Sequence, residues 1–364
     1  MKRSVDTPFL LTFLVLLSFG LLIFTSAALG LLARDGADFQ NVAVSQLFLG
    51  LLLGSVLMLA LSRLDYRSLR PYTPYFFGFA ILLVCLTFVP GIGLTLKGAS
   101  RWLSLGPVTL QPAELLKFAT VALLAAVYAK HLRDAPTWRG GILPLGLIAG
   151  GSAALLLLQP DTDGAAVILL AGAAVLFAAG GKVRHLALLA LIALLALGAA
   201  VYQRPYLAER FTTFLNPTAD RQGAGWQIDQ SLIAVGSGGL MGRGFGQSIE
   251  KFSYLPEPIG DSIFAVAAEE FGFVGTMLLV VLYAGVALLG LRIAARAPDP
   301  FGGLLVVGLV VLIIGQSFMN IASTLGLIPL SGLPLIFVSH GGTSLMIALA
   351  EVGVILSVSR RMRS

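Results

Sequence analysis

The sequence predicts an all-α protein that crosses a membrane ten times, organised as a single domain over residues 1–364. Three observations support this prediction. Long apolar runs recur along nearly the whole chain, and basic residues gather in alternate loops between them. Charged residues make up 12% of the chain, about half the share that is typical of soluble domains. Only helices pair every backbone N–H and C=O within such runs in lipid.

Each expected span is a run of about 20 apolar residues, which as a helix crosses the hydrocarbon core of a bilayer. The first run follows basic residues, as in a signal peptide. It is longer than a signal-peptide core and no clear cleavage site follows it, so we expect it to be retained as a span. The ten spans are residues 9–32, 43–62, 75–93, 112–130, 141–159, 164–181, 185–202, 262–291, 301–323 and 341–359.

The loops between these spans alternate in charge. Fifteen of the 24 lysines and arginines fall at the termini and in every second loop, which predicts that both termini face the cytoplasm across the cytoplasmic membrane. The opposite loops are expected on the outer side. They include a segment of about 203–261 between spans seven and eight, which is too long for a simple connection and is expected to be functional. Within it, residues 226–235 favour an interfacial helix.

Residues 324–340 are apolar but are interrupted by Gly326, Pro329, Gly332 and Pro334. Irregular backbone is tolerated at membrane depth only where protein surrounds it. We therefore expect a re-entrant or surface-lying segment here rather than another span.

Several classes of site are excluded by composition. Cys85 is the only cysteine, so neither a disulfide framework nor a cysteine-based metal site is possible. The three histidines are scattered, which argues against a histidine-rich zinc site. The net charge of +6 reflects the loop pattern and does not indicate nucleic-acid binding. No predicted strand precedes the glycines at 236–246, and no phosphate-loop Gly-Lys-Ser/Thr occurs, so no nucleotide site is expected.

Two charges lie within the fourth expected span. Glu114 and Lys117 are three residues apart and therefore share one helix face, near the outer end where Pro112 suits the first turn. An ionisable residue inside a span is costly unless it faces protein or water and has a partner. Two interpretations follow: a structural ion pair between helices, or a polar cavity that opens to the outer surface.

Asp261 begins the eighth expected span and is the candidate general base. Partial burial disfavours its ionised form, whereas a nearby Lys117 or Lys251 would favour it, and this balance tunes a base toward working pH. The alternative is an ordinary helix N-cap. Glu269 is eight residues on and nearly in line, so we expect it, rather than Glu270, to share the face of Asp261.

Two further features remain open at this stage. The glycine-rich stretch 236–246 is interpreted either as a tight turn or as a backbone nest for an anion, supported by Arg243 and Lys251. Glu351, in the last span, is a lone acid and is interpreted as structural or as a partner for a cationic side chain.

Taken together, these residues resemble the SEDS family of peptidoglycan polymerases, which includes FtsW, RodA and SpoVE. The resemblance covers nearly the whole chain. It departs from the usual pattern around Asp261, where Ile259-Gly260 and Ser262 replace the common flanks, and this bears on how substrate is positioned. The motifs that carry the resemblance are Lys97-Gly98-Ala99 with Arg101-Trp102, Gln111-Pro112 with Glu114 and Lys117, Gln159-Pro160-Asp161, Gly225-Trp226-Gln227 with Gln230-Ser231, Gly242, Gly244 and Gly246 with Ser248, Leu255-Pro256-Glu257 with Asp261, Glu269-Glu270 with Gly272 and Gly275, and Phe337, Ser339, Gly341-Gly342 and Ser344.

The resemblance implies an inverting glycosyltransferase that polymerises lipid II into glycan strands for cell division or cell shape. Asp261 would be the catalytic base. The leaving group, a lipid pyrophosphate, needs cations, and a divalent ion such as Mg²⁺ or Mn²⁺ could assist, with its ligands left open. The implied partners are lipid II, membrane lipid and a class B penicillin-binding protein, and stretches 25–27 and 248–254 favour the division type. The expected substrate-binding residues are Arg101, Glu114, Lys117, Arg243, Lys251, Glu257 and Ser339.

Two alternatives come from other functional classes. A lipid II flippase would also need many spans and a polar cavity, but transporter sites lie near the bilayer midplane, often between repeated halves, whereas the charges here concentrate toward one surface and no repeat is evident. A scaffold that only recruits the transpeptidase would tolerate the combined loss of Asp261, Glu114 and Lys117.

Overall fold

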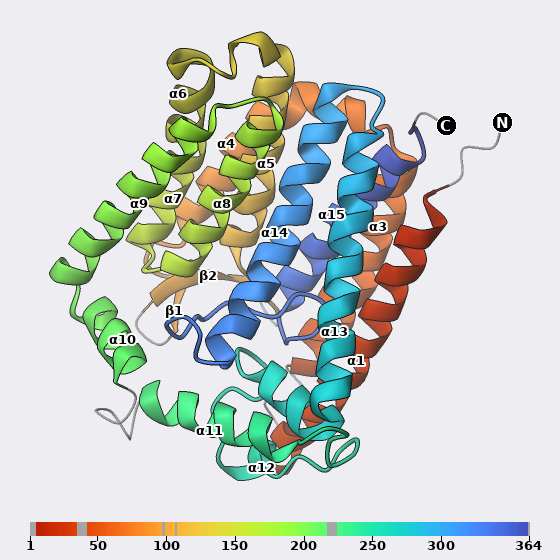
Figure 1. Cartoon of the computed structure of the whole chain (residues 1–364), viewed down its shortest axis with the longest axis vertical. Helices are drawn as coiled ribbons and strands as arrows, with labels where there is room; N and C mark the ends of the chain where they lie inside the picture. Colours follow the sequence, from red (N-terminus) through yellow and green to blue (C-terminus); the bar gives the residue numbers. More distant parts are fainter. Residues whose placement is uncertain (1–4, 35–41, 97–98, 106–107, 217–223, 363–364) are drawn as a thin grey trace.

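The computed structural model describes residues 5–34, 42–96, 99–105, 108–216 and 224–362. Its long helices run roughly side by side along one axis, and a small sheet and three short helices gather at one end (Figure 1). Some residues of the charge pattern and motifs lie outside the described part of the chain: Lys2, Arg3, Lys97, Gly98, Arg221 and Arg363.

The first half of the chain supplies the sheet and the helices from α1 to α8. Its elements are α1 (Thr7–Arg34), η1 (Ser45–Leu53, π-helical), α3 (Gly54–Arg63), η2 (Tyr66–Tyr72), α4 (Thr73–Leu86), β1 (Gly93–Leu96), β2 (Ala99–Leu105), β3 (Val108–Leu110), α5 (Pro112–Lys130), η3 (Leu132–Asp134), η4 (Trp138–Ile142), α6 (Leu143–Leu145), η5 (Gly146–Gly150), α7 (Gly151–Leu158) and α8 (Thr162–Ala178).

The second half supplies the long segment 203–261, called the outer segment after its predicted side of the membrane, and the most deeply buried helix, α15. Its elements are α9 (Val183–Gln203), α10 (Pro205–Leu215), α11 (Ala224–Ser237), α12 (Glu250–Ser253), α13 (Ile263–Ala295), α14 (Pro300–Thr324) and α15 (Gly342–Ser359).

The all-helical, polytopic architecture is confirmed. Among the described residues, nine helices are long and apolar enough to cross a membrane. The sixth expected span corresponds to α8, which is apolar but has 17 residues and is therefore short for a perpendicular crossing. The count of ten stays a prediction.

Helix α15 forms the centre of the bundle. In the most apolar stretch of α15, 100% of the residues are buried inside the protein. The corresponding share is 72% for α5, 67% for α14 and 0% for α9. A helix that is apolar on every side is stable only when protein or lipid surrounds it, and here α3, α5 and α14 surround α15. Small residues permit the closest approach: a Cβ added to Gly353 would lie 2.6 Å from the carbonyl oxygen of Met58.

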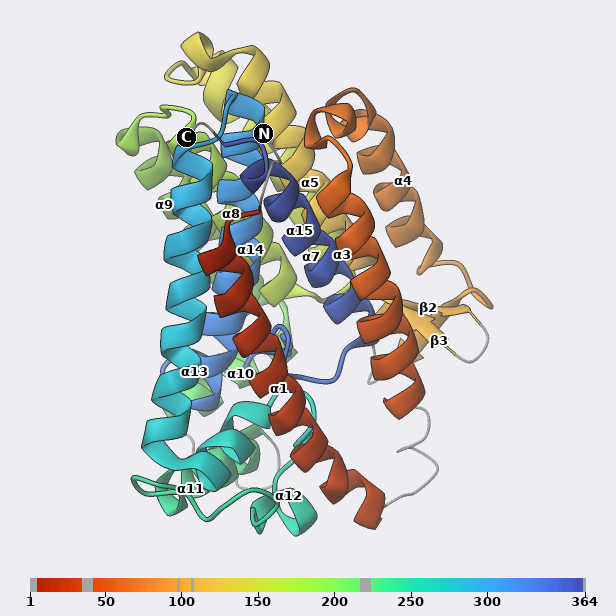
Figure 2. The ribbon, with the colours of Figure 1, turned by 90° about the vertical axis from the view of Figure 1, so that its right-hand side faces the viewer.

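The two ends of the described chain meet at one end of the bundle (Figure 2). The backbone N–H of Asp6 donates to Ser359 Oγ at 3.2 Å. At the same end, Arg67 Nε lies 2.8 Å from Asp299 Oδ2. Burial by itself raises the pKa of the Asp299 carboxyl, but hydrogen bonds from Tyr66 and Arg67 outweigh burial, so this pKa lies below its usual value. Thus hydrogen bonds and an ion pair join the segments that meet at this end, where basic residues are frequent.

The opposite end contains a small sheet that the sequence analysis treated only as a loop. Strands β1, β2 and β3 form an antiparallel sheet in that order, with Gly93 opposite Leu103 and Leu105 opposite Val108. Strands this short carry little periodicity, which explains why the sequence did not reveal them. The predicted helix within 203–261 is confirmed as α11, and two further helices, α10 and α12, accompany it.

Residues 325–341 contain no helix longer than a turn. Their central part is buried, with Leu335 and Val338 fully so. The expectation of an irregular segment surrounded by protein is therefore confirmed. It lies between α14 and α15 and reaches the turn that precedes α13.

The glycine-rich stretch packs against a kink in α13. Gly272 has a left-handed backbone (φ 64°) inside that helix, which frees the carbonyls of the preceding turn. The backbone N–H of Arg243 then donates to the backbone carbonyl oxygen of Glu269, and the N–H of Gly244 donates to that of Glu270, each at 2.9 Å. These bonds satisfy groups that would otherwise be buried and unpaired. The interpretation as a tight turn therefore accounts for these glycines without a bound anion.

Replacing Gly242 by Ala is expected to destabilise the protein. Gly242 has φ +78° and a Cβ there would lie 2.1 Å from the carbonyl oxygen of Glu270, so backbone strain of about 1–3 kcal/mol is joined by a clash with backbone. Gly246 is a matched control, because it has φ +80° but nothing within 4 Å. Heating followed by size-exclusion chromatography should show a larger loss of folded protein for Gly242→Ala than for Gly246→Ala. Equal losses would contradict the crowding argument.

Candidate active site

Asp261 lies in a tight turn just before α13, at the end of the bundle that carries the sheet. Its side chain is half-buried. Its carbonyl oxygen accepts hydrogen bonds from Asn320 Nδ2 at 2.9 Å and Thr324 Oγ1 at 3.3 Å, both on the last turns of α14. The N-cap of α13 is Ser262, so capping does not account for the aspartate. The backbone is held while the carboxylate keeps partial access to water.

The irregular segment 332–340 holds this turn from the other side. Ser339 Oγ donates to the carbonyl oxygen of Gly260 at 2.8 Å, and the N–H of His340 donates to the carbonyl oxygen of Ile259 at 2.7 Å. Ser339, expected to contact substrate, therefore also fixes the backbone of the turn.

Glu257 sits at the start of the same turn. Its carbonyl oxygen accepts from the N–H of Gly260 at 3.0 Å and of Ser262 at 3.3 Å, and its backbone is left-handed (φ 49°). Burial lowers the pKa of His340 to about 4, with Glu257 acting in the opposite direction. His340 is therefore neutral near pH 7, and the acidic groups set the charge of the turn.

Lys117 is the centre of a second polar cluster, inside the bundle. Its Nζ lies 2.8 Å from Glu114 Oε1 and also donates to Gln316 Oε1 on α14. Glu351 of α15 lines the same small cavity, which has room for about one water at about 10 Å³. Ile336, from the segment that reaches the Asp261 turn, also lines it. The ion pair therefore exists in the structure, and a small cavity lies beside it. An opening of this cavity to the outer surface stays a prediction.

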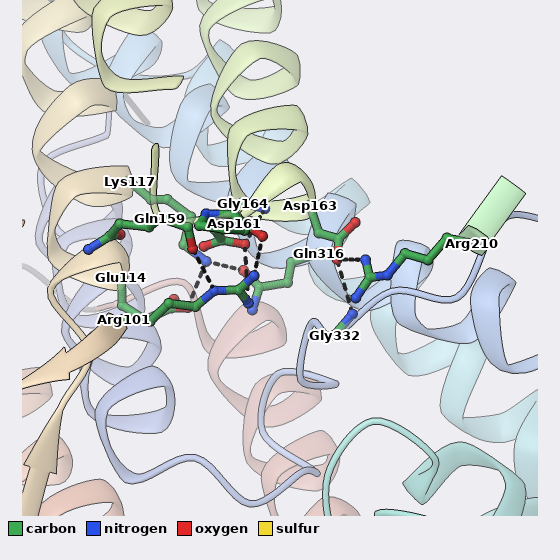
Figure 3. Close-up of polar contacts among 11 residues, drawn as sticks. Arg101, Glu114, Lys117, Gln159, Asp161, Asp163, Gly164, Arg210, Gln316 and Gly332 are labelled. Atoms are coloured by element: carbon green, nitrogen blue, oxygen red, sulfur yellow. Dashed lines mark hydrogen bonds and ion pairs between the residues drawn. The ribbon is translucent and has the colours of Figure 1, made fainter. Parts of the chain in front are cut away.

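Arg101 projects from β2 toward the turn that precedes α8 (Figure 3). Its Nε donates to the carbonyl oxygen of Gln159 at 3.1 Å, a second nitrogen donates to the carbonyl of Pro160, and a third lies 3.9 Å from Asp161 Oδ1. Asp161 in turn caps α8 by accepting from the N–H of Gly164. Arg101 therefore ties the sheet to the start of α8 while 23% of its side chain stays exposed.

Lys251 and Glu270 form a fully buried pair. Lys251 Nζ lies 2.6 Å from Glu270 Oε1 and 2.9 Å from Ser26 Oγ, and the exposed fraction of both charged side chains is 0%. An ammonium without exposed surface has no access to a lipid pyrophosphate. In place of the expected substrate contact, we propose that Lys251 fixes the outer segment to α1 and α13.

Glu269 also points toward the outer segment and does not take the direction expected from the spacing. Its carboxylate accepts from Ser248 Oγ at 2.6 Å and from the N–H of Ile249 at 3.0 Å. Arg243 Nε lies 3.5 Å from the same carboxylate and keeps 38% of its side chain exposed. Helical spacing placed Glu269 in line with Asp261, but Ser262 has non-helical φ and ψ and separates Asp261 from α13, so the spacing does not extend to Asp261.

Replacing Lys251 by Met is expected to destabilise the protein by about 3–5 kcal/mol, the usual cost of leaving a buried charge without its partner. The double variant Lys251→Met/Glu270→Leu should recover much of this loss, because neither charge then remains. Thermal unfolding of the purified protein measures both. A double variant that is as stable as wild type yet inactive would instead place Lys251 in substrate binding.

Sequence reasoning missed several residues of this region. Gln316 and Asn320 are four apart in an apolar span, and polar residues at such positions generally face other helices, so their spacing carried a usable signal. Asp163 and Arg210 are brought together from α8 and α10 at 3.3 Å, and nothing in their sequence spacing predicts that contact.

The divalent ion stays a prediction. Within the described ranges, no three His, Cys, Asp or Glu side chains gather closely enough to hold a metal ion. We therefore assign no step of the reaction to a metal.

The fold and the site define a polytopic membrane protein with a half-buried carboxylate at one end of the bundle and buried ion pairs between its segments. The chain belongs to the family of cell cycle proteins that comprises FtsW, RodA and SpoVE, whose model matches residues 7–364. This confirms the resemblance inferred from the motifs.

Individual relatives are similar over almost their whole length. Stage V sporulation protein E of Bacillus subtilis strain 168 is 36% identical over 363 residues, covering 100% of this chain and 99% of that protein. A probable peptidoglycan glycosyltransferase FtsW of Geobacter sp. strain M18 is 37% identical over 362 residues, covering 98% and 97%.

Solved structures agree with the fold. A chain from a peptidoglycan synthase complex that coordinates polymerization and crosslinking has a TM-score of 0.76 and 29% identity, covering 95% of this chain and 96% of that one. The rod shape determining protein RodA of Thermus thermophilus has a TM-score of 0.67 and 30% identity, covering 96% and 97%.

Proposed function

We propose that this protein is a peptidoglycan glycosyltransferase that polymerises lipid II at the outer face of the cytoplasmic membrane, for cell division or cell shape. Residues 1–364 would act as one domain. The observation that carries the proposal is the turn of Asp261: α14 and segment 332–340 fix its backbone, whereas its carboxylate stays half-buried. This arrangement suits a general base, and relatives that match nearly the whole chain bear the name of this activity.

The proposed reaction is the one that membership of the family implies. Asp261 accepts the proton of the acceptor sugar's 4-hydroxyl as that oxygen attacks the anomeric carbon of the donor. The new glycosidic bond forms as the bond to the lipid pyrophosphate breaks, with inversion, and the pyrophosphate departs with the electron pair. General-base assistance of this kind contributes about 10²–10⁴-fold in rate.

Positive charge is needed where the pyrophosphate departs. Arg101 and Arg243 keep part of their surface exposed, 23% and 38% of their side chains, and Lys117 lies in the cavity between the helices. We assign Arg101, Arg243 and Glu257 to direct contact with the substrate. Lys117 and Glu114 expose only 4% and 7% of their side chains and would act through the cavity that they line, whereas Lys251 is left out because it is 0% exposed. Ser339 is buried and positions the turn.

The orientation of the chain is part of this proposal. The start of α1 and the end of α15 lie together at one end of the bundle (Figure 2). Asp261, in the turn before α13, lies at the other end. With both termini in the cytoplasm, as the loop charges predict, Asp261 faces the outer surface, where lipid-linked sugars would be joined. A class B penicillin-binding protein is the proposed partner, supported by the similarity to a chain of a peptidoglycan synthase complex.

The test is polymerisation of lipid II by the purified full-length protein, with and without a class B penicillin-binding protein, followed by electrophoresis of the glycan products. Glycan strands from wild type support the proposal. A flippase would instead move labelled lipid II across liposomes and leave the sugar unpolymerised. A scaffold would still recruit its partner and support growth after Asp261, Glu114 and Lys117 are all replaced. Either result, without glycan synthesis, overturns the proposal.

A further inference from the structure

Asp163, in the first turn of α8, contacts two elements from distant parts of the chain. Its Oδ2 accepts a hydrogen bond from the backbone N–H of Gly332 at 3.0 Å and lies 3.3 Å from a guanidinium nitrogen of Arg210 on α10 (Figure 3). The Asp163 side chain is 18% exposed and the Arg210 side chain 28%. Burial raises the pKa of the Asp163 carboxyl, whereas the charge of Arg210 and the hydrogen bond from Gly332 act in the lowering direction and favour its ionised form.

Gly332 is the immediate neighbour of the catalytic candidate. A Cβ added to Gly332 would have one heavy atom within 4 Å, Asp261 Oδ2, at 3.8 Å. The carboxylate of Asp261 thus faces the backbone of Gly332, and the N–H of Gly332 is bound by Asp163. One hydrogen bond thus joins Asp163 to the residue whose backbone lies beside the candidate base.

The segment that carries Gly332 depends on side chains for its position. It is irregular and contains Pro329 and Pro334, which have no backbone N–H to donate. Its other anchors in this stretch are also side chains: Ser323 Oγ lies 3.1 Å from Ser331 Oγ, and Asn320 Nδ2 donates to the carbonyl oxygen of Leu333 at 2.8 Å. Those two anchors come from α14, which directly precedes the segment in the chain. Asp163 is different because it comes from α8.

We propose that Asp163 is a positioning residue for glycan polymerisation: it holds Gly332 against the Asp261 carboxylate and ties α10 of the outer segment to the same point through Arg210. This inference rests on the proposed function. Loss of the anchor releases one wall of the space beside Asp261, and a misplacement of about 1 Å at a reacting group costs up to about 10²-fold in rate.

The experiment measures kcat, KM and the pH–rate profile of lipid II polymerisation for the full-length protein carrying Asp163→Ala or Asp163→Asn. Asp134→Ala is the control, because Asp134 is an exposed aspartate at the opposite end, where its carboxylate lies 3.6 Å from His131. We expect Asp163→Ala to lower kcat about 10-fold or more, to leave KM within about 2-fold, and to shift the midpoint of the pH–rate curve. Asp163→Asn keeps an oxygen that accepts from Gly332 and should stay within about 3-fold of wild type.

The outcomes separate this inference from the proposed function. If wild type makes no glycan, the proposed function fails. If wild type is active and Asp163→Ala keeps its kcat and pH profile, the positioning role is overturned. An equal loss of kcat in Asp163→Ala and Asp163→Asn, together with a lower unfolding temperature, also overturns it in favour of a merely structural role.

A second variant tests the other half of the connection. Gly332→Ala adds a methyl group at an ordinary contact distance of 3.8 Å from Asp261 Oδ2, so the protein should fold. The methyl group would nevertheless occupy space beside the carboxylate, and we expect reduced kcat with an unchanged unfolding temperature. Full activity of Gly332→Ala would show that the space between Gly332 and the Asp261 carboxylate is not needed for the reaction.

Discussion

Replacing Asp261 by Asn is expected to lower lipid II polymerisation by about 10²–10⁴-fold, the contribution typical of a general base. The amide has nearly the same shape but does not accept the proton of the attacking hydroxyl. The hydrogen bonds from Asn320 and Thr324 go to the backbone carbonyl of this residue, so the substitution leaves them in place. The turn should therefore persist, and the loss should appear in kcat with little change in thermal stability. The measurement is the initial rate of glycan synthesis by purified protein.

Asp229→Asn on α11 is the matched control, since it removes an outer carboxylate elsewhere and should retain wild-type activity. Undiminished synthesis by Asp261→Asn would remove Asp261 from the role of base, whatever the other variants show. A fall in rate accompanied by an equal fall in unfolding temperature would assign the residue to the fold instead.

Replacing Lys117 by Met is expected to abolish activity and to destabilise the protein by about 3–5 kcal/mol, because Glu114 is then left buried without its cation. Lys117 and Glu114 expose only 4% and 7% of their side chains, so solvent screens little of this cost. Thermal unfolding and polymerisation are measured on the same preparation.

The double variant Glu114→Gln/Lys117→Met separates the two consequences. It removes both charges of the pair, so most of the stability should return, whereas activity should stay lost if Lys117 supplies charge to the departing pyrophosphate. Recovery of activity together with stability would show that the pair only holds α5 in place.

Much of the architecture was predictable because lipid restricts the choice of structure. Apolar runs near 20 residues have only the helix available, so most described helices fall at the expected positions, and the prolines and glycines of 324–340 correctly predicted an irregular segment. The third span, expected at 75–93, was placed too late: its helix ends at Leu86 and Gly93 begins a strand. The three-stranded sheet at 93–110 was not predicted. Its strands have seven residues or fewer, and pairing between strands is a contact that periodicity within one strand does not report.

Composition and motif order by themselves determined the class of protein, its family, and the residues Asp261, Glu114 and Lys117 as the centre of interest. Only the tertiary structure decided which partner each charged side chain contacts. It buried Lys251 against Glu270, turned Glu269 toward the outer segment, and placed Asp163 on Gly332 beside Asp261. The physical reason is that span position depends on hydrophobicity within one segment, whereas the partner of a charge depends on which segments pack side by side.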